Sequence, residues 1–241
     1  MGISVVLLAY KEAENLKILL PQIIENVKKT GEEYEILVVD TKEPLDNTKE
    51  VCEEFKARYI NQEEPAFAGA FKTGIKYAKM DKFLILDSDG SHNPASIPDI
   101  HKKFVSENCD VVIGSRYVKG GITNDAKSSV IMSKILNTMF RVFLGIKAKD
   151  ISTDYRMYET TQLKKVRLTC MNYDVLQEVL LRLKMNKPGG RLKIGEVPIH
   201  FNKRIYGESK RRLLPFIISY IKTLFRLTFT RVFGKRGAAY E

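Results

Sequence analysis

We predict an α/β protein in which helices cover both faces of a mostly parallel β-sheet. Two observations support this fold class. Short apolar runs of strand length alternate with amphipathic, helix-length segments through the first 115 residues. Polar side chains follow these apolar runs, at the carboxyl ends of strands, where sheets of this kind bind ligands. The chain has 241 residues, of which 44% are hydrophobic and 29% charged, so it can bury a large core of its own.

Five short runs are expected to form the strands, because they are rich in Val, Ile, Leu, Phe and Tyr and are bounded by polar or turn-forming residues. In chain order they are 3–9, 34–40, 58–61, 83–86 and 109–115. The longer runs have no polar alternation, which is typical of strands buried on both faces of a parallel sheet.

Four segments between these strands have the apolar spacing of helices: 12–29, 45–57, 65–79 and 95–105. The first keeps that spacing despite Pro21. The third contains several small residues, where the helix can pack close to the sheet. Because strands and helices alternate, the sheet is expected to be mostly parallel.

The chain carries 40 Lys and Arg against 29 Asp and Glu, which gives a net charge of +11 and a pI near 9.4. Such an excess favours polyanionic partners: nucleic acid, an anionic membrane or a phosphorylated ligand. No helix-turn-helix, zinc-finger or RNA-binding signature accompanies the charge, so we expect no nucleic-acid partner.

Much of the positive charge lies near the C-terminus. The segment 209–236 is helix-prone and rich in Leu, Ile and Phe, but Lys222, Arg226 and Arg231 interrupt it too often for it to span a bilayer. Basic helices with bulky apolar faces lie in the membrane interface. We therefore divide the chain into a domain over 1–207 and a basic, amphipathic helical extension over 208–241. Two alternatives are a terminal helix packed on the domain and a surface that binds an integral-membrane partner subunit.

The rest of the composition indicates a cytoplasmic protein. No apolar run of membrane-spanning length and no signal-peptide pattern is present, so we expect a location at the cytoplasmic face of a membrane, with peripheral contact. The cysteines, Cys52, Cys109 and Cys170, are scattered and odd in number. They predict reduced thiols rather than a disulfide framework or a metal cluster.

The stretch "KFLILDSDGSH" (82–92) carries the strongest local signal. Its strand ends in two carboxylates, Asp87 and Asp89, which point the same way because side chains at i and i+2 of an extended chain share a face. Two like charges held close together repel unless a cation lies between them. The pair therefore indicates a divalent metal with oxygen ligands, although "DSDG" is also compatible with a surface turn.

Several motifs together resemble one family. "AYKEAEN" (9–15) resembles the opening motif of family 2 glycosyltransferases, whose nucleotide-binding fold is called GT-A, and "DSDGSH" resembles their metal-binding D-x-D motif. Downstream, "GSRYVKGG" (114–121), "DISTDYRMY" (150–158) and "EVPIHFNKRIYGESK" (196–210) resemble the dolichol- or polyprenyl-phosphate mannose synthase branch in order and spacing. The resemblance covers roughly residues 3–212.

The resemblance implies a binding site for a nucleoside-diphosphate sugar. Ala9, Tyr10, Glu12 and Asp40 would hold the base and ribose beside Asp87. Asp89 would act on the metal, Mg²⁺ or Mn²⁺, for which Asp87, Asp89 and Ser91 are the expected ligands. Arg204 and Lys210 would close over the diphosphate. His92 either supports the metal site from behind or caps the helix that begins near Pro94.

The acceptor side leaves two possibilities open. A phosphate monoester is already largely dianionic at neutral pH and needs cations rather than a base. Arg116, which we count as catalytic, Lys127 and Ser133 would bind such a phosphate, with Lys119 and Lys134 nearby. A sugar hydroxyl needs a carboxylate base, and Asp154, where the branch usually has glycine, is a candidate for that base.

We therefore predict an inverting glycosyltransferase that moves a hexose from a nucleoside-diphosphate sugar to a polyprenyl phosphate. GDP-mannose is the favoured donor and UDP-glucose the second. The alternatives are transfer to a saccharide hydroxyl in the synthesis of a surface glycan and, in a different class, a non-catalytic module that binds a membrane or nucleic acid.

Overall fold

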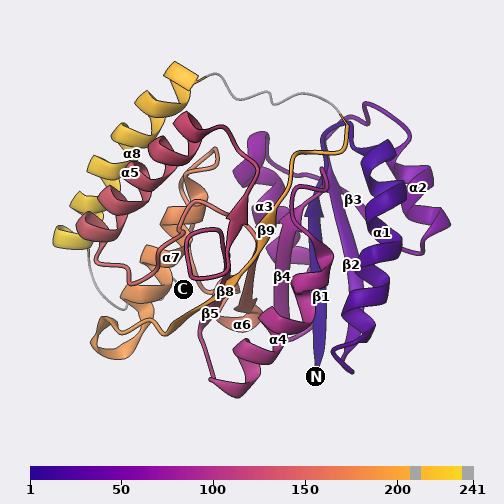
Figure 1. Cartoon of the computed structure of the whole chain (residues 1–241), viewed down its shortest axis with the longest axis horizontal. Coiled ribbons are helices and arrows are strands. Elements are labelled where there is room, and N and C mark those ends of the chain that lie inside the picture. Colours follow the sequence, from indigo (N-terminus) through magenta and orange to yellow (C-terminus); the bar gives the residue numbers. More distant parts are fainter. Residues whose placement is uncertain (207–212, 235–241) are drawn as a thin grey trace.

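The computed structural model of the chain describes residues 1–206 and 213–234, and its centre is a seven-stranded sheet (Figure 1). The strands of this sheet are β1 (Gly2–Leu8), β2 (Glu33–Asp40), β3 (Arg58–Asn61), β4 (Lys82–Asp87), β5 (Val111–Ser115), β7 (Arg156–Glu159) and β8 (Ile194–Pro198). Their order across the sheet is β3-β2-β1-β4-β7-β5-β8.

All neighbouring strands of this sheet pair in parallel except β7, which runs antiparallel between β4 and β5. The predicted α/β class with a mostly parallel sheet is confirmed. The five strands predicted from the sequence are present, with bounds that differ by a few residues. We did not predict β7 or β8, because their residues mix charged and apolar side chains and resemble loops in a window of this length.

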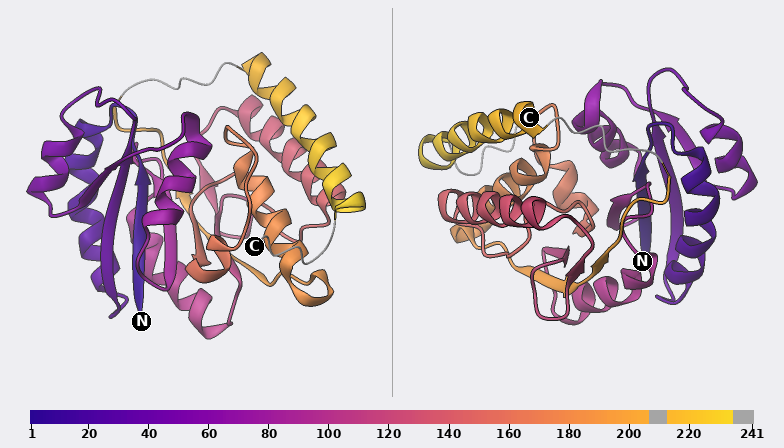
Figure 2. Two further views of the ribbon diagram at one scale, coloured as in Figure 1. Left: turned by 180° about the vertical axis from the view of Figure 1, so that it is seen from behind. Right: turned by 45° about the horizontal axis from the view of Figure 1, so that its top comes forward.

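The helices form two layers, one on each face of the sheet (Figures 1 and 2). On one face, α1 (Ala13–Lys28), α2 (Thr48–Glu54) and α4 (Ile97–Ser106) pack on one apolar core. The other face carries a second core, covered by α3 (Ala66–Tyr77), α5 (Lys127–Leu144), α6 (Thr160–Lys164), α7 (Val175–Asn186) and α8 (Leu213–Phe233). Since both faces are covered, the longer strands β1, β2 and β4 carry continuous apolar runs.

A short 3-10 turn, η1 (Pro94–Ser96), precedes α4, so the predicted helix over 95–105 begins as a tighter turn. The cap of this turn is Asn93, whose side-chain oxygen accepts a hydrogen bond from the amide of Ala95 at 2.9 Å. The hypothesis that His92 caps this helix is therefore wrong, and its ring points into the site described below. A second 3-10 turn, η2 (Pro188–Gly190), follows α7.

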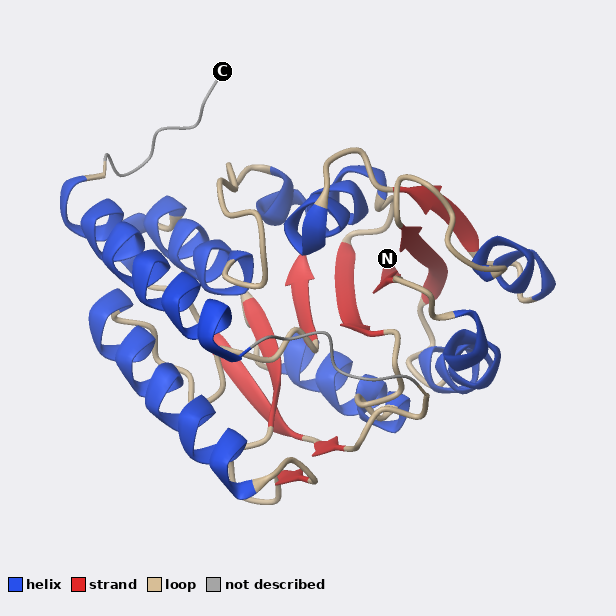
Figure 3. Cartoon of the chain, turned by 90° about the horizontal axis from the view of Figure 1, so that it is seen from above, coloured by secondary structure: helices blue, strands red, loops and turns tan. Residues whose placement is uncertain are grey.

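The C-terminal helix α8 lies between α5 and α7 (Figure 3). Tyr220, Thr223, Leu224 and Leu227 are buried in this contact, and the Thr223 hydroxyl donates to Asp174 at 2.6 Å. One face of α8 thus belongs to the core of the domain, as in the alternative of a packed terminal helix. The predicted boundary at 207/208 lies at the edge of the described residues.

Cations from two other helices cap the C-terminal end of α5. Lys184 of α7 donates to the carbonyls of Leu144 and Gly145, and Arg231 of α8 donates to that of Phe143 at 2.6 Å. Gly145 is left-handed (φ 62°), and a Cβ there would lie 2.8 Å from both cations. These contacts fix α8 against α5 and neutralise the negative end of the α5 dipole.

A small second sheet pairs β6 (Ile122–Thr123) with β9 (His200–Phe201) in parallel. It holds the chain after β8 close to the loop that follows β5. From β9 the chain continues toward the loop that contains Asp89.

Candidate active site

The two carboxylates after β4 lie at the carboxyl edge of the sheet, as predicted. Ser91 contacts both of them: its amide donates to Asp89 Oδ1 at 2.9 Å, and its hydroxyl donates to Asp87 Oδ2 at 3.3 Å. One residue therefore holds the two acidic side chains near each other. Ser91 is buried, and both its amide and its hydroxyl already donate hydrogen bonds. Its role as a metal ligand stays a prediction.

Asp89 forms an ion pair with Arg204, whose Nη2 lies 2.6 Å from Asp89 Oδ2. Burial by itself raises the pKa of the Asp89 carboxyl, but hydrogen bonds from Ser91 and the charge of Arg204 outweigh it, so the net pKa is lowered. Asp89 is thus ionised at neutral pH. The two residues come from segments 115 positions apart, and the sequence expectation that both belong to one site is consistent with this contact.

The segment that carries Arg204 is held over the loop after β4 by backbone hydrogen bonds. The amide of Asn202 donates to the carbonyl of Ser91 at 2.8 Å, and that of Ile205 donates to the carbonyl of Asp89 at 3.0 Å. Gly90 (φ 79°) accommodates this approach, since a Cβ there would lie 2.5 Å from Ile205 Cδ1. The position of Arg204 therefore depends on this loop.

Asn15, at the start of α1, connects the same segment to the first predicted motif. Its Nδ2 donates to Glu12 Oε2 at 2.5 Å, and its Oδ1 accepts from the amide of Tyr206 at 3.0 Å. Sequence analysis did not identify Asn15 as a site residue, although it lies inside "AYKEAEN". Lys210 lies outside the described residues.

The base and ribose side of the expected site is partly closed. Asp40 is fully buried and accepts hydrogen bonds from the amide of Thr41 at 2.8 Å and from the hydroxyl of Tyr59 at 2.9 Å. Burial raises the pKa of Asp40 above its usual value, although both hydrogen bonds act against this. Contact with a ribose or a base requires Asp40 to become accessible, and its donor-binding role stays a prediction. Tyr10, in contrast, is 48% exposed at the end of β1, and Ala9 is buried beside it.

His92 lies beneath the two carboxylates and is fully buried. Its Nδ1 accepts a hydrogen bond from the amide of Asp87 at 3.1 Å, so the proton of the neutral ring is on Nε2, which donates to Thr153 Oγ1 at 3.1 Å. Burial lowers the pKa of His92 and outweighs the nearby acidic groups, which raise it. His92 thus supports the backbone at Asp87 as a neutral ring.

Asp154 is a third acidic residue at this place. Its Oδ1 lies 3.6 Å from His92 Nδ1, and Asp87 Oδ2 lies 3.4 Å from the same atom. Ligand atoms of Asp87, His92 and Asp154 all lie within 4.8 Å of one another. Both ring nitrogens of His92 are engaged in hydrogen bonds, so Asp87 and Asp154 supply the candidate donors here, and their carboxylate oxygens are ligands that suit Mg²⁺ or Mn²⁺.

Arg116, at the end of β5, is buried in an ion pair with Asp150. Its Nε lies 2.8 Å from Asp150 Oδ2 and its Nη2 lies 2.9 Å from Oδ1, and the Arg116 amide also donates to this carboxylate at 3.1 Å. The guanidinium carbon lies 5.0 Å from the centre of the Tyr117 ring and 5.2 Å from that of Phe201. Burial raises the pKa of Asp150, but the hydrogen bonds and charge of Arg116 outweigh burial and lower it overall.

This pair changes the interpretation of Arg116. We expected its charge to be available to an acceptor phosphate, whereas Asp150 neutralises most of it. Ser133 lies beside the pair, with its hydroxyl 3.5 Å from Arg116 Nη2, so the structure brings these two predicted residues together. Lys127 is exposed at the start of α5. Sequence analysis quoted the motif that begins with Asp150 but missed its role; the signal was that a buried arginine needs a carboxylate partner.

Comparisons with solved structures identify the fold. A solved structure of glucosyl-3-phosphoglycerate synthase from Mycobacterium tuberculosis, in complex with Mn²⁺, UDP and glucosyl-3-phosphoglycerate, matches 95% of this chain and 79% of its own, with a TM-score of 0.69 and 18% identity. The same enzyme with Mg²⁺ and UDP gives a TM-score of 0.70 at 17% identity. The predicted GT-A type of fold is thereby confirmed.

Sequence comparisons define the family. The model of glycosyl transferase family 2 matches residues 4–167, and the chain therefore belongs to this family of enzymes. It is 30% identical over 240 residues to a dolichol-phosphate mannosyltransferase of Pyrococcus furiosus, a match that covers 94% of this chain and 64% of that protein. It is also 30% identical to a polyprenol monophosphomannose synthase of Mycolicibacterium smegmatis, with coverages of 86% and 79%. The chain thus spans somewhat less than two thirds of the first relative.

The described part of the chain, residues 1–206 and 213–234, contains no helix that is both long and apolar enough to span a membrane.

The Arg116–Asp150 pair generates a prediction about stability. Asp150→Asn leaves the guanidinium buried without its counter-charge, so the free energy of unfolding at pH 7 should fall by about 3–5 kcal/mol. Urea unfolding measures this. Because the folded-state pKa of Asp150 is lowered, its contribution is present above the unfolded pKa of about 3.9 and is lost as the pH falls through the folded value. Because Asn does not titrate, the stability of Asp150→Asn should fall less than that of the unmodified chain as the pH is lowered through this range.

Asp125→Asn is the matched control. Asp125 also faces Arg116, at 3.6 Å, but is partly exposed, so its loss should change the stability by less than about 1 kcal/mol. Equal stabilities of the Asp150 and Asp125 variants would contradict a structural role for the buried pair.

Proposed function

We propose that the chain is an inverting glycosyltransferase that moves a hexose, with mannose favoured, from a nucleoside-diphosphate sugar to a polyprenyl phosphate. The observation that carries this proposal is the membership of family 2 together with the paired carboxylates at the end of β4. The names of the relatives support mannose and a polyprenyl acceptor. GDP-mannose is the first choice of donor, and UDP-glucose is the second, since the fold neighbours bind UDP.

In this proposal Asp87 and Asp89 hold the divalent cation, Mg²⁺ or Mn²⁺. When bound, the cation stabilises the negative charge that develops on the diphosphate leaving group. The residues of the chain orient the donor: Tyr10, Glu12 and Asp40 lie toward the base and ribose, and Arg204, with Lys210, toward the diphosphate.

The Asp89–Arg204 pair suggests how this site changes on binding. In the structure Arg204 donates a hydrogen bond to Asp89 Oδ2, an oxygen that could otherwise bind the cation. A diphosphate offers Arg204 oxygens of higher negative charge, so binding of the donor can transfer Arg204 from Asp89 to the diphosphate and free Asp89 for the cation. The cation and the donor would then bind cooperatively.

We predict that Asp89→Asn lowers the transfer rate by about a hundredfold or more, because a group that stabilises transition-state charge is lost. EDTA should do the same to the unmodified chain and should have little further effect on the variant. Transfer from radiolabelled GDP-mannose to a short polyprenyl phosphate measures both. Full activity in EDTA would remove the cation from the mechanism.

Arg204→Gln tests whether Arg204 moves from Asp89 to the diphosphate when the donor binds. Without nucleotide, this variant should bind Mn²⁺ more tightly than the unmodified chain because Asp89 is no longer paired, whereas its affinity for the nucleoside diphosphate should fall. Calorimetric titration separates the two affinities. If both fell together, Arg204 would support the cation site rather than compete with it.

The acceptor phosphate, in this proposal, binds beside Arg116 and Ser133. A phosphate monoester needs no base, and the remaining charge for it comes from the exposed Lys127 together with Lys119 or Lys134. Arg116, held by Asp150, acts mainly by positioning Ser133 and the loop after β5.

A second candidate function is transfer to a saccharide hydroxyl, and the position of Asp154 favours it. Ligand atoms of Asp154, Asp87 and His92 lie within 4.8 Å of one another, and in this proposal the reacting sugar would bind near Asp87. An inverting enzyme with a hydroxyl acceptor needs a base there.

Two variants distinguish the acceptors. If a phosphate attacks, Lys127→Gln should weaken the apparent affinity for the lipid phosphate, and Asp154→Asn should keep the rate within about tenfold. If a hydroxyl attacks, Asp154→Asn should lower the rate by about 10²–10⁴-fold. Steady-state kinetics on a short prenyl phosphate, with Mn²⁺ affinity of each variant as a control, decide between them. A loss of metal binding in Asp154→Asn would instead assign Asp154 to the cation site.

We further propose that α5 and α8 contact the cytoplasmic face of a membrane, the alternative being contact with an integral-membrane partner subunit. The two helices lie side by side (Figures 1 and 3). Each exposes large apolar side chains beside basic ones. The exposed apolar residues are Ile131, Ile135, Val142 and Phe143 of α5 and Ile221, Phe225, Phe229, Val232 and Phe233 of α8. Basic helices with such faces bind the interface of anionic bilayers.

Phe225→Asp should reduce sedimentation with anionic liposomes several-fold, because Phe225 is 71% exposed and its loss removes apolar area while adding a repelled charge. Val105→Asp, on the opposite face of the sheet, is the matched control. Equal liposome binding of the two variants would favour a protein partner for this surface.

A further inference from the structure

A cavity of about 420 Å³ lies beside the C-terminal half of α5. Its charged lining consists of Arg141 of α5, Lys147 and Lys149 of the following loop, and Glu196 of β8. Ile146 and Val142 contribute apolar walls. None of these residues belongs to the candidate active site.

The charges of this cavity are not balanced. Both oxygens of Glu196 accept backbone hydrogen bonds, from the amide of Lys149 at 2.8 Å and from that of Asp150 at 3.1 Å. Among residues 1–206 and 213–234, the side chains of Arg141, Lys147 and Lys149 have no carboxylate within ion-pair distance. Three cations thus face one carboxylate that already has donors.

Arg141 carries the most specific signal. Its Nε is buried and has no hydrogen-bond acceptor within the described chain. A buried donor without an acceptor costs free energy, and native proteins rarely keep one unless a ligand or water satisfies it. Arg141 therefore has an unused donor and lines a cavity with two further cations, a combination that favours an anion as the acceptor.

The C-terminal end of α5 does not repel an anion in this cavity. The last carbonyls of α5 would repel it, but Lys184 and Arg231 donate hydrogen bonds to them. These two cations offset the negative end of the helix dipole.

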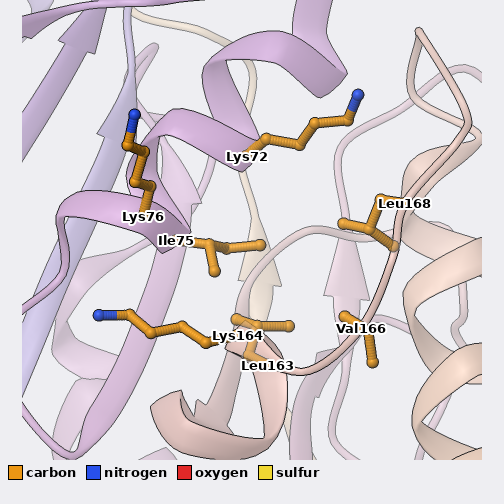
Figure 4. Close-up of a pocket in the computed structure, with 7 residues that line it drawn as sticks. All are labelled: Lys72, Ile75, Lys76, Leu163, Lys164, Val166 and Leu168. Atoms are coloured by element: carbon orange, nitrogen blue, oxygen red, sulfur yellow. The ribbon is translucent and has the colours of Figure 1, made fainter. Parts of the chain in front are cut away.

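A second cavity, of about 370 Å³, shows the contrast (Figure 4). It also has three cationic side chains, all of them lysines, but Lys72 pairs with Glu64 at 2.6 Å, Lys76 with Glu63 at 2.6 Å, and Lys164 donates to a backbone carbonyl at 2.7 Å. In Figure 4 the ends of these side chains point away from the apolar residues in the middle. The lysines of this cavity have partners, whereas within residues 1–206 and 213–234 the cations of the cavity beside Arg141 have no carboxylate partner.

We propose that the cavity beside Arg141 binds a phosphate group. The guanidinium fork matches phosphate oxygens, and Lys147 and Lys149 can add point charges from the rim. The phosphate can be free or the headgroup of an anionic lipid, and Val142, 68% exposed on the rim, continues into the apolar surface of α5. The proposal does not depend on the donor, the acceptor or the reaction.

The test is a titration of the full chain with inorganic phosphate in EDTA, followed by calorimetry. Arg141→Gln should weaken binding by about tenfold or more, as expected for loss of a charge-assisted hydrogen bond. Arg191→Gln, an exposed arginine outside the cavity, is the charge-matched control, and Arg204→Gln reports any phosphate in the donor site. Equal phosphate affinities of the Arg141 and Arg191 variants would overturn the proposal.

A defect in folding can be recognised separately. Since Arg141 Nε has no partner, Arg141→Gln should keep or raise the melting temperature in buffer without phosphate, while the gain in melting temperature on adding phosphate should be lost. Lys149→Gln, at an exposed side chain, should weaken phosphate binding without affecting folding. If Lys149→Gln and Arg141→Gln both retain the full phosphate-induced gain, the cavity does not bind phosphate.

Vesicles identify the source of the phosphate. Phosphatidylcholine vesicles with and without phosphatidic acid are compared for the unmodified chain, Arg141→Gln and Arg191→Gln. A larger loss of the phosphatidic-acid-dependent binding in Arg141→Gln than in Arg191→Gln supports a lipid headgroup. Equal losses, with weaker binding of inorganic phosphate only in Arg141→Gln, support a free phosphate ligand.

Discussion

The hydrogen bonds between the loop after β4 and the segment 200–206 hold the candidate site together. Backbone groups of Asp89 and Ser91 pair with those of Ile205 and Asn202, and Arg204 lies between them on Asp89. Asn15 then connects this segment to the start of α1. Three parts of the chain, far apart in sequence, meet because the parallel sheet brings the carboxyl ends of β1 and β4 to one edge.

Two ion pairs lie at the carboxyl edge of the sheet, and they differ in how exposed they are to solvent. Arg204 and Asp89 form a partly exposed pair, which in the proposed mechanism a diphosphate and a cation would each enter, because both are groups of high charge. Arg116 and Asp150 form a buried, bidentate pair, and two aromatic rings lie near the guanidinium. If either residue lost its partner, a charge would remain buried without a counter-charge or water. The first pair is therefore suited to binding and the second to keeping the loop after β5 in place.

The helical layer of α5, α7 and α8 combines two roles. Leu224 and Leu227 of α8 complete the core on one face of the sheet, while Phe225 and Phe229 are exposed on the same helix. A helix with apolar residues on both sides can pack on its own domain and still present an apolar surface. The two hypotheses for the C-terminal segment, packing and membrane contact, are thus compatible with each other.

The sequence alone determined the positions of five strands along the chain, the fold class and the acidic pair at the end of β4, because apolar runs of strand length and the i, i+2 spacing of carboxylates are local properties. The family motifs also named Arg204 and Ser133, which the structure brings beside Asp89 and Arg116, and their roles in donor and acceptor binding stay predictions. Only the tertiary structure decided that β7 inserts antiparallel between β4 and β5, since pairing between distant strands depends on burial across the whole sheet. It likewise decided that Asp150 neutralises Arg116, that Arg204 occupies Asp89 and that Asp40 is closed off, because each depends on which residues fold against it rather than on its neighbours in the chain.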